Sequence, residues 1–260
     1  MNIAFTVCGF FVGALVGVTG VGGGSVMTPL LILLFRVHPL AAVGTDLLYA
    51  AVTKATGTGV HAQRGNIEWR VVGWLALGSV PGALATILLV ARLPARSPEL
   101  THVITAAIGV ALLLAAAGLL FGENASRLAA RRGGNEQTYS PPARPGLTVL
   151  LGLVLGVLVS LTSVGAGAIG IAILRLLYPK LPPARLVGSD IAHAVPLTLL
   201  AGGGHWFMGD VDWVLLGSLL IGSIPGIVLA SRCANWVSEA ILRRGLGVVL
   251  LTVAVPIILT

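Results

Sequence analysis

The chain has 260 residues, of which 56% are hydrophobic and only 10% are charged, and its mean hydropathy is +0.99. Soluble domains carry about 25% charged residues, so this composition excludes an ordinary soluble protein and indicates a helical integral membrane protein. Continuous apolar runs at 74–91 and 106–121 do not fit the alternating segments of a membrane β-barrel. The net charge of +7 comes from basic residues beside apolar spans, which favours membrane orientation over binding to nucleic acid.

Ten apolar segments with helical character follow one another along the chain. They lie at 3–18, 26–35, 40–61, 67–91 and 100–121, and then at 147–161, 168–178, 184–205, 211–234 and 238–259. A long polar stretch rich in Arg, Gly and Pro separates the two sets and indicates a linker. We therefore expect a first membrane repeat at 1–121, a cytoplasmic linker at 122–145 and a second membrane repeat at 146–260. Cys8 and Cys233 lie among apolar residues, so we expect them to pack as small hydrophobic side chains rather than to form a disulfide or a metal site.

The second half of the chain repeats the first at an offset of 144 residues over 39–82. This offset pairs Gly44-Thr45-Asp46 with Gly188-Ser189-Asp190, and Glu68-Trp69 with Asp212-Trp213. It also pairs the proline-containing motif at 78–82 with the one at 222–226. Two glycine-rich clusters, at 18–25 and 161–168, align at an offset of 143. Matches in register over such a length indicate an internal structural repeat.

The basic residues predict that the two repeats have inverted topology. If the first two segments of each half return to one side and the next three cross, each half crosses the membrane an odd number of times. Twelve of the fifteen Lys and Arg residues outside the spans then share one side, whereas an even number of crossings divides them nine to six. We therefore predict an all-α membrane protein of two inverted repeats, each with a broken-helix or re-entrant pair and three transmembrane helices. Both termini are predicted to be periplasmic and the linker cytoplasmic.

The two glycine-rich clusters are predicted to break their helices and to form the binding site. Each glycine costs about 1 kcal/mol relative to alanine in a helix, and a broken helix at membrane depth survives where its backbone lines a polar cavity or is buried in protein. The amides that begin the following helix attract anions. The predicted substrate-binding residues are Thr19, Gly22, Gly23, Gly24 and Ser25 in the first half and Thr162, Ser163, Gly165 and Gly167 in the second. The alternative is that these glycines only allow helices to approach closely.

Two aspartates inside predicted spans form a second group of candidate residues. An ionisable residue at the centre of a membrane helix costs at least ~2.5 to 3.5 kcal/mol and is usually functional. Lys54 follows Asp46 by eight residues on a similar helical face, and His193 follows Asp190 by three residues on the same face. Either these four residues form a charge network that couples transport, with Asp190 and His193 as the better proton relay, or Asp46–Lys54 and Asp190–His193 are buried pairs that fix packing.

Several motifs in order along the chain resemble the TauE/SafE sulfite-exporter family of membrane permeases. They are Gly20-Val21-Gly22-Gly23-Gly24-Ser25 with Pro29, then Ala42-Val43-Gly44-Thr45-Asp46, then Arg64-Gly65-Asn66-Ile67-Glu68-Trp69-Arg70, with weaker copies in the second half. The resemblance covers nearly the whole chain apart from the linker. It implies a permease of the bacterial inner membrane for a small sulfur-containing anion such as sulfite or an organosulfonate, with no cofactor and no ATP-binding domain of its own.

The leading hypothesis is a secondary transporter, most simply an exporter, that binds its anion between the glycine clusters and is coupled to protons or to the membrane potential. Two carboxylates near an anion require that they are protonated or paired with Lys54, Arg175 or His193, or that the substrate differs. One alternative is a passive anion channel. Another is an intramembrane aspartyl protease, in which Asp46 and Asp190 share a proton. The chain lacks the Gly-x-Gly-Asp pattern of that group, so it is not expected to be an enzyme.

Overall fold

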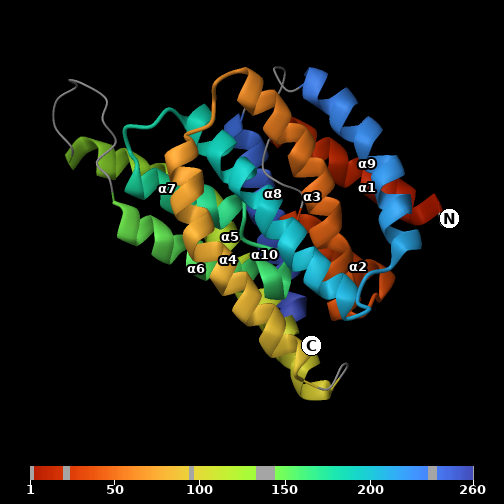
Figure 1. Ribbon diagram of the computed structural model, residues 1–260. Helices are drawn as coiled ribbons and strands as arrows, with labels where there is room; N and C mark the ends of the chain where they lie inside the picture. The colour runs from red at the N-terminus through yellow and green to blue at the C-terminus, as the bar shows by residue number, and fades with distance from the viewer. Residues whose placement is uncertain (1–2, 20–23, 94–96, 133–143, 234–238, 260) are drawn as a thin grey trace.

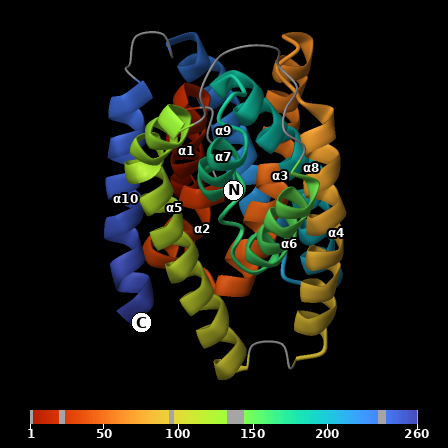
Figure 2. The same cartoon turned by 90° about the vertical axis from the view of Figure 1, so that its left-hand side faces the viewer.

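The computed structural model describes residues 3–19, 24–93, 97–132, 144–233 and 239–259, and within these ranges it contains helices and no strands. All ten predicted helical segments are present (Figures 1 and 2). The first half consists of α1 (Ile3–Thr19), α2 (Gly24–Phe35), α3 (Pro39–Gln63), α4 (Trp69–Ala91) and α5 (Pro98–Arg132). The second half consists of α6 (Pro145–Thr162), α7 (Ala168–Leu177), α8 (Pro183–Phe207), α9 (Trp213–Cys233) and α10 (Glu239–Leu259). The prediction of an all-helical fold is therefore confirmed.

Helix boundaries follow local signals that the sequence shows. Helices α3, α5, α6 and α8 begin at a proline, whose fixed φ suits the first helical position and whose missing N–H has no partner there in any case. The turns after α3 and α8 contain Gly65 at φ 64° and Gly209 at φ 82°, in equivalent places of the two halves. Helix α5 differs from prediction because it continues to Arg132 rather than ending at Phe121. Its last residues are mostly good helix formers, including Ala and Arg, which explains the extension into the polar stretch.

Five helices in the described part of the chain are long and apolar enough to cross a membrane. They are Trp69–Ala91, Pro98–Phe121, Pro145–Thr162, Pro183–Phe207 and Trp213–Ala230. Helix α3 has the length of a span, but it carries polar residues such as Asp46 and Lys54, both of which are buried. Helices α2 and α7, with 12 and 10 residues, are shorter than the thickness of a bilayer requires. Cys8 on α1 is a free, half-buried cysteine, whereas the side chain of Cys233 lies outside the described part.

The two halves pack against each other through equivalent contacts. The most extensive helix pairs are α1 with α9 and α4 with α6, so the first helix of each half lies on the fourth helix of the other. Gly9 and Gly13 of α1 let its backbone approach α9 closely, and Gly152 and Gly156 do the same for α6 against α4. Such small-xxx-small spacing is typical of membrane helix contacts. The first pair of glycines maps onto the second at the 143-residue offset, which makes the two interfaces copies of one arrangement.

Helices α3 and α8 lie side by side at the centre and run antiparallel. Gly57, near the end of α3, faces Ile191 near the start of α8, while Gly202, near the end of α8, packs on Leu48. These two helices are equivalent members of the repeat and contain half of the buried polar side chains of the described residues. Helices α5 and α10, a second equivalent pair, pack together at one side of the bundle (Figure 2).

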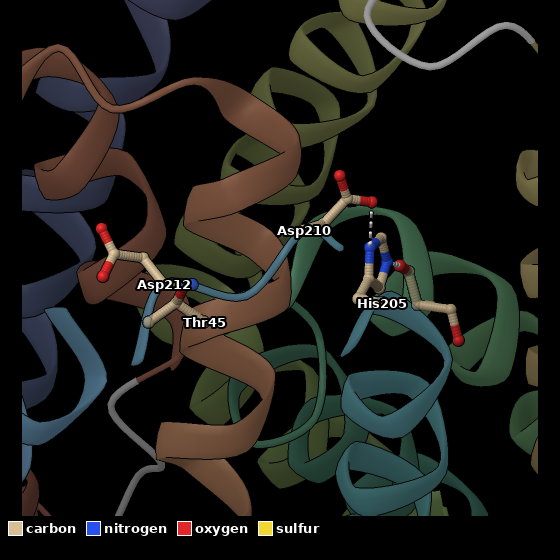
Figure 3. A network of polar contacts seen from close by, with 5 residues as sticks. Thr45, His205, Asp210 and Asp212 are labelled. Atoms are coloured by element: carbon tan, nitrogen blue, oxygen red, sulfur yellow. Dashed lines mark hydrogen bonds and ion pairs between the residues drawn. The ribbon is translucent and has the colours of Figure 1, made fainter. Parts of the chain in front are cut away.

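Hydrogen bonds between the halves repeat in the same way. The backbone N–H of Asp212, just before α9, donates to the Thr45 hydroxyl at 3.0 Å (Figure 3). At the equivalent place, the backbone N–H of Glu68 donates to the Ser189 hydroxyl at 2.8 Å. Thr45 and Ser189 each stand directly before an aspartate. Each therefore anchors the turn that leads into the fourth helix of the other half.

Candidate functional site

The second glycine cluster interrupts the chain between α6 and α7, as the sequence predicts. Helix α6 ends at Thr162, and Ser163 adopts a left-handed conformation with φ 57°. Gly165 and Gly167 have φ of 132° and 120°, which side chains rarely adopt, and Gly167 is the N-cap of α7. The glycines are thus required by the backbone of this interruption. The alternative that they serve only close helix packing does not account for their conformation.

The Thr162 hydroxyl stabilises the interruption itself. It accepts a hydrogen bond from the Val164 N–H at 3.0 Å and lies 2.6 Å from the Leu158 carbonyl oxygen, to which it donates. The Thr162 hydroxyl oxygen is therefore already hydrogen-bonded to the loop and to the preceding helical turn. Thr162 shapes the interruption, while Ser163 has a buried hydroxyl with no hydrogen-bond partner among the described residues.

The first glycine cluster lies between the end of α1 at Thr19 and the start of α2 at Gly24. Gly22 and Gly23 lie outside the described residues, as do the side chains of Thr19 and Ser25. Gly24 is the first helical residue of α2. Helices α1 and α2 thus flank this part of the chain, and the predicted interruption itself lies outside the described residues.

Asp46 is completely buried on α3 and faces groups from both halves of the chain. The Thr28 hydroxyl, one turn into α2, donates to its Oδ2 atom at 2.5 Å. Ser163, at the start of the second interruption, faces the same carboxylate, although its hydroxyl makes no hydrogen bond of ordinary geometry. The Oδ1 atom of Asp46 has no partner in the described part of the chain. Asp46 is therefore hydrogen-bonded to the short helix of the first half but not to the interruption of the second.

Lys54 reaches across to the second half rather than to Asp46 on its own helix. Its side chain is 5% exposed, and Nζ donates to the Ala166 carbonyl oxygen, within the second interruption, at 3.0 Å. Electrostatically it acts most strongly on Asp190 and less on Asp46. The eight residues between Asp46 and Lys54 correspond to about 12 Å along the helix axis, which explains why they do not form a direct pair.

Asp190 is buried on α8 against the start of α7. The Gly167 amide lies close to its carboxylate, yet neither carboxylate oxygen has a hydrogen-bond partner among the described residues. Gly170 leaves the space that this carboxylate occupies, because a Cβ atom there would collide with Oδ1. The beginning of α7, where an anion was predicted to bind, thus already has a carboxylate of the protein beside it. Lys54 attracts this carboxylate electrostatically, but no hydrogen bond joins the two groups.

His193 bonds to the other half instead of to Asp190. Its Nε2 atom is 2.8 Å from the Ser79 hydroxyl on α4, while Nδ1 has no partner in the described residues. The equivalent contact joins Tyr49 on α3 to Ser223 on α9 at 2.7 Å. Sequence reasoning did not select Ser79 or Ser223 as site residues, although the repeated motif at 78–82 and 222–226 contains them both. Thr28 and Ala166 were also missed, because their roles arise only from tertiary contact.

A further histidine links α8 to the end of the second half's first helix. Because a carbonyl oxygen only accepts, His205 Nε2 must donate to the Ser160 carbonyl, 2.9 Å away. The Nδ1 atom lies 3.4 Å from Oδ2 of Asp210, in the turn after α8 (Figure 3). At the equivalent place the first half has His61 and Asn66. This contact closes the turn, and His205 and Asp210 both pack against Gly44, two residues before Asp46.

Comparison with known proteins agrees with the long apolar helices of the fold in indicating a membrane protein. Residues 5–257 match the family described as sulfite exporter TauE/SafE. The chain is 38% identical over 232 residues to the probable membrane transporter protein YjnA of Bacillus subtilis (strain 168), covering 89% of this chain and 90% of that protein. It is 30% identical over 241 residues to the probable membrane transporter protein YdhB of the same organism, covering 91% and 92%. A probable membrane transporter protein of Methanocaldococcus jannaschii is 23% identical over 256 residues, covering 94% of this chain and 89% of the relative.

No solved structure matches the chain. The family match spans nearly the whole bundle, from α1 to α10, and includes both interruptions and both buried aspartates. The names of the relatives indicate a membrane transporter rather than an enzyme. This chain is a multi-pass membrane protein that belongs to the sulfite exporter TauE/SafE family.

Proposed function

We propose that the protein is a secondary transporter that exports sulfite, or a related small sulfur-containing anion such as an organosulfonate, across the bacterial inner membrane. The family description supports this substrate class, and the relatives' names support transport. The observation that carries the proposal is that α3 is hydrogen-bonded to both short-helix regions, through Thr28 of α2 to Asp46 and through Lys54 to Ala166 of the second interruption. It supports an arrangement in which the starts of the two short helices approach one place.

The anion is held, in this proposal, by backbone amides and hydroxyls at the two interruptions. In the first half these belong to Thr19, Gly22, Gly23, Gly24 and Ser25, and in the second to Ser163, Gly165 and Gly167 with Thr162 as support. Unpaired amides at the start of a helix favour a small oxyanion, and the positive end of the helix dipole adds to this attraction. Ser163 supports the assignment, since its buried hydroxyl is unpartnered among the described residues.

The buried charges supply the coupling. Two carboxylates beside an anion require compensation, which Lys54 provides in part and which a proton on Asp190 completes. Both Asp190 oxygens lack a hydrogen-bond partner in the described residues, as does Nδ1 of His193 one turn away, so these two residues are the proposed proton acceptors. Proton entry with anion release would then couple flux to the pH gradient.

The two halves, 1–121 and 146–260, are proposed to be inverted repeats that rock about the site. The antiparallel packing of the equivalent helices α3 and α8 supports this topology, as does the exchange of equivalent contacts between α1–α9 and α6–α4. The distribution of basic residues supports a topology in which both termini are periplasmic and the linker at 122–145 is cytoplasmic.

Transport of radiolabelled sulfite into proteoliposomes tests the proposal. The native protein should give saturable flux with counterflow against unlabelled sulfite, and Gly167→Leu should abolish it, because a side chain is strained at φ 120° and would occupy the start of α7. Gly217→Leu is the matched control, since nothing lies within 4 Å of a Cβ at Gly217. Unsaturable flux without counterflow would indicate a channel. Full activity of Gly167→Leu would refute the binding site.

A further inference from the structure

A cavity of about 670 Å³, here called the α2–α5 cavity, lies between the turn that joins α2 to α3 and the first turns of α5. Three of its lining residues, Arg36, His38 and His102, have basic side chains. Thr101 and Thr105 add hydroxyl groups, and none of the described lining residues is acidic. None of them belongs to the glycine clusters or to the buried aspartates. The cavity is therefore a basic site separate from the one described above.

The basic side chains of the α2–α5 cavity are available to a ligand. Arg36, His38 and His102 make no ion pair and no side-chain hydrogen bond with any residue that the structure describes. Glu99, three residues before His102, is exposed and does not line the cavity. Arginine carries five N–H donors, and a histidine ring always carries at least one. Such a set of donors suits an anionic oxygen group, and the guanidinium fork suits a phosphate in particular.

The backbone at Arg36 is one that favours glycine. Its φ is 55°, and the N–H of Val37 donates to the Leu31 carbonyl oxygen at 3.1 Å, six residues earlier. This hydrogen bond is typical of a helix that ends with a glycine in the left-handed conformation. An arginine is strained there, so the ending of α2 does not explain its presence. A bound anion does explain it, because the side chain lines the cavity.

The size, depth and apolar wall of the cavity fit a phospholipid better than a free inorganic anion. Pockets of about 300 to 1,000 Å³ enclose ligands of drug size, and a single oxyanion would fill only a small part of this one. The candidate span of α5 begins at Pro98, so the cavity lies where that span meets the headgroup region. Ile32 and Leu33 form an apolar wall, and the neighbouring Leu34 is exposed on α2.

We propose that the α2–α5 cavity binds the headgroup of an anionic phospholipid. The guanidinium of Arg36 contacts the phosphate, His38 and His102 donate to its oxygens, and an acyl chain leaves over the apolar wall of α2. Basic pockets between membrane helices recognise anionic headgroups in this way. Helices α2 and α5 make few direct contacts, so the lipid bridges them and supports the short helix that follows the first glycine cluster.

Native mass spectrometry of the detergent-purified protein, with phosphatidylglycerol or phosphatidylcholine added, tests this inference. The native protein should bind one phosphatidylglycerol roughly tenfold more tightly than phosphatidylcholine, whose choline group cancels the negative charge. Arg36→Gly should lose this preference. Its unfolding midpoint in lipid-free detergent should stay the same or rise, because glycine suits φ 55°. If this variant is not monodisperse, Arg36→Asn replaces it, since asparagine also adopts the left-handed conformation.

Arg92→Gln is the matched control and should keep the preference for phosphatidylglycerol. Arg92 is exposed at the end of α4, in the segment that leads to α5, and does not line the cavity. Equal affinity of the native protein for the two lipids would overturn the inference, as would full preference in Arg36→Gly or an equal loss in Arg92→Gln. Displacement of phosphatidylglycerol by excess inorganic phosphate or sulfite would also overturn it, because the cavity would then hold a free oxyanion. No transport is measured, so each of these results leaves the sulfite proposal intact.

Discussion

Asp46 and Asp190 occupy equivalent places in a repeated motif, but their surroundings differ. Asp46 accepts a hydrogen bond from Thr28 and faces Ser163. Asp190 has no hydrogen-bond partner among the described residues and depends on Lys54 and on the nearby Gly167 amide. One carboxylate thus accepts a hydroxyl hydrogen bond at one of its oxygens, and the other has no such partner among the described residues.

The repeat therefore gives the two aspartates equivalent positions, whereas single residue differences around them give them different partners. The residue equivalent to Thr28 is Ile171, which offers no hydroxyl to Asp190, and the residue equivalent to Lys54 is Thr198. Asp46 therefore has a hydroxyl partner that Asp190 lacks, and only the first half carries the lysine. The two halves share backbone contacts but differ in the groups around their aspartates.

The largest expected effect comes from removing the charge on which Asp190 depends. Lys54→Met should destabilise the protein by about 3 to 5 kcal/mol in choline chloride, because the buried Asp190 carboxylate loses the cation whose field acts on it and the Ala166 carbonyl loses its hydrogen-bond donor. The unfolding midpoint in detergent measures this loss. The exposed Lys180 provides the control, and Lys180→Met should change stability by no more than about 0.5 kcal/mol.

The two aspartates should respond unequally to the same substitution. Asp190→Asn leaves the Lys54 ammonium with the Ala166 carbonyl as its hydrogen-bond acceptor, so we expect a loss of about 2 to 4 kcal/mol. Asp46→Asn keeps an oxygen that accepts from Thr28 and should cost about 1 kcal/mol. Unfolding midpoints of the two variants compare them directly. Equal losses would mean that the two surroundings are energetically alike.

A smaller effect is expected from the glycine beneath Asp190. Gly170→Ala places a Cβ atom against Oδ1 of Asp190 and should destabilise by about 1 to 3 kcal/mol through overpacking. Gly217→Ala, where the added atom meets open space, should instead leave stability unchanged or slightly raised. If both variants behaved alike, the close approach of α7 to Asp190 would be wrong.

The smallest effects concern the paired hydroxyls of α4 and α9. Ser79→Ala removes the partner of His193, and Ser223→Ala removes the partner of Tyr49. Each should cost about 1 kcal/mol, since each leaves one buried polar atom unpaired. Similar unfolding midpoints for the two variants would support equivalent roles, whereas a loss confined to Ser79→Ala would show that the His193 side is the more constrained.

The helices could be predicted from the sequence because long apolar runs, prolines at helix starts and glycine clusters are local signals. All ten segments are confirmed, and the second interruption contains the residues with positive φ that its glycines predict. The predicted end of α5 at Phe121 was wrong. The change from apolar to polar composition after Phe121 marks the end of a membrane span and not the end of the helix.

The partners of the buried charges could not be predicted, because they come from segments distant in the chain. Lys54 bonds to Ala166, 112 residues away, and His193 bonds to Ser79, 114 residues away. The sequence hypothesis used helical periodicity, which pairs residues within one helix and so favoured Asp46–Lys54 and Asp190–His193. A backbone carbonyl such as that of Ala166 carries no sequence signal at all.

A double-mutant cycle on Lys54 and Asp190 tests the cross-half compensation most directly. The unfolding midpoints of Lys54→Met, Asp190→Asn and the double variant are measured in choline chloride. We predict a coupling free energy of about 2 kcal/mol or more, with the double variant more stable than Lys54→Met. Strictly additive losses, or an equally large coupling between Lys54 and Asp46, would contradict the account.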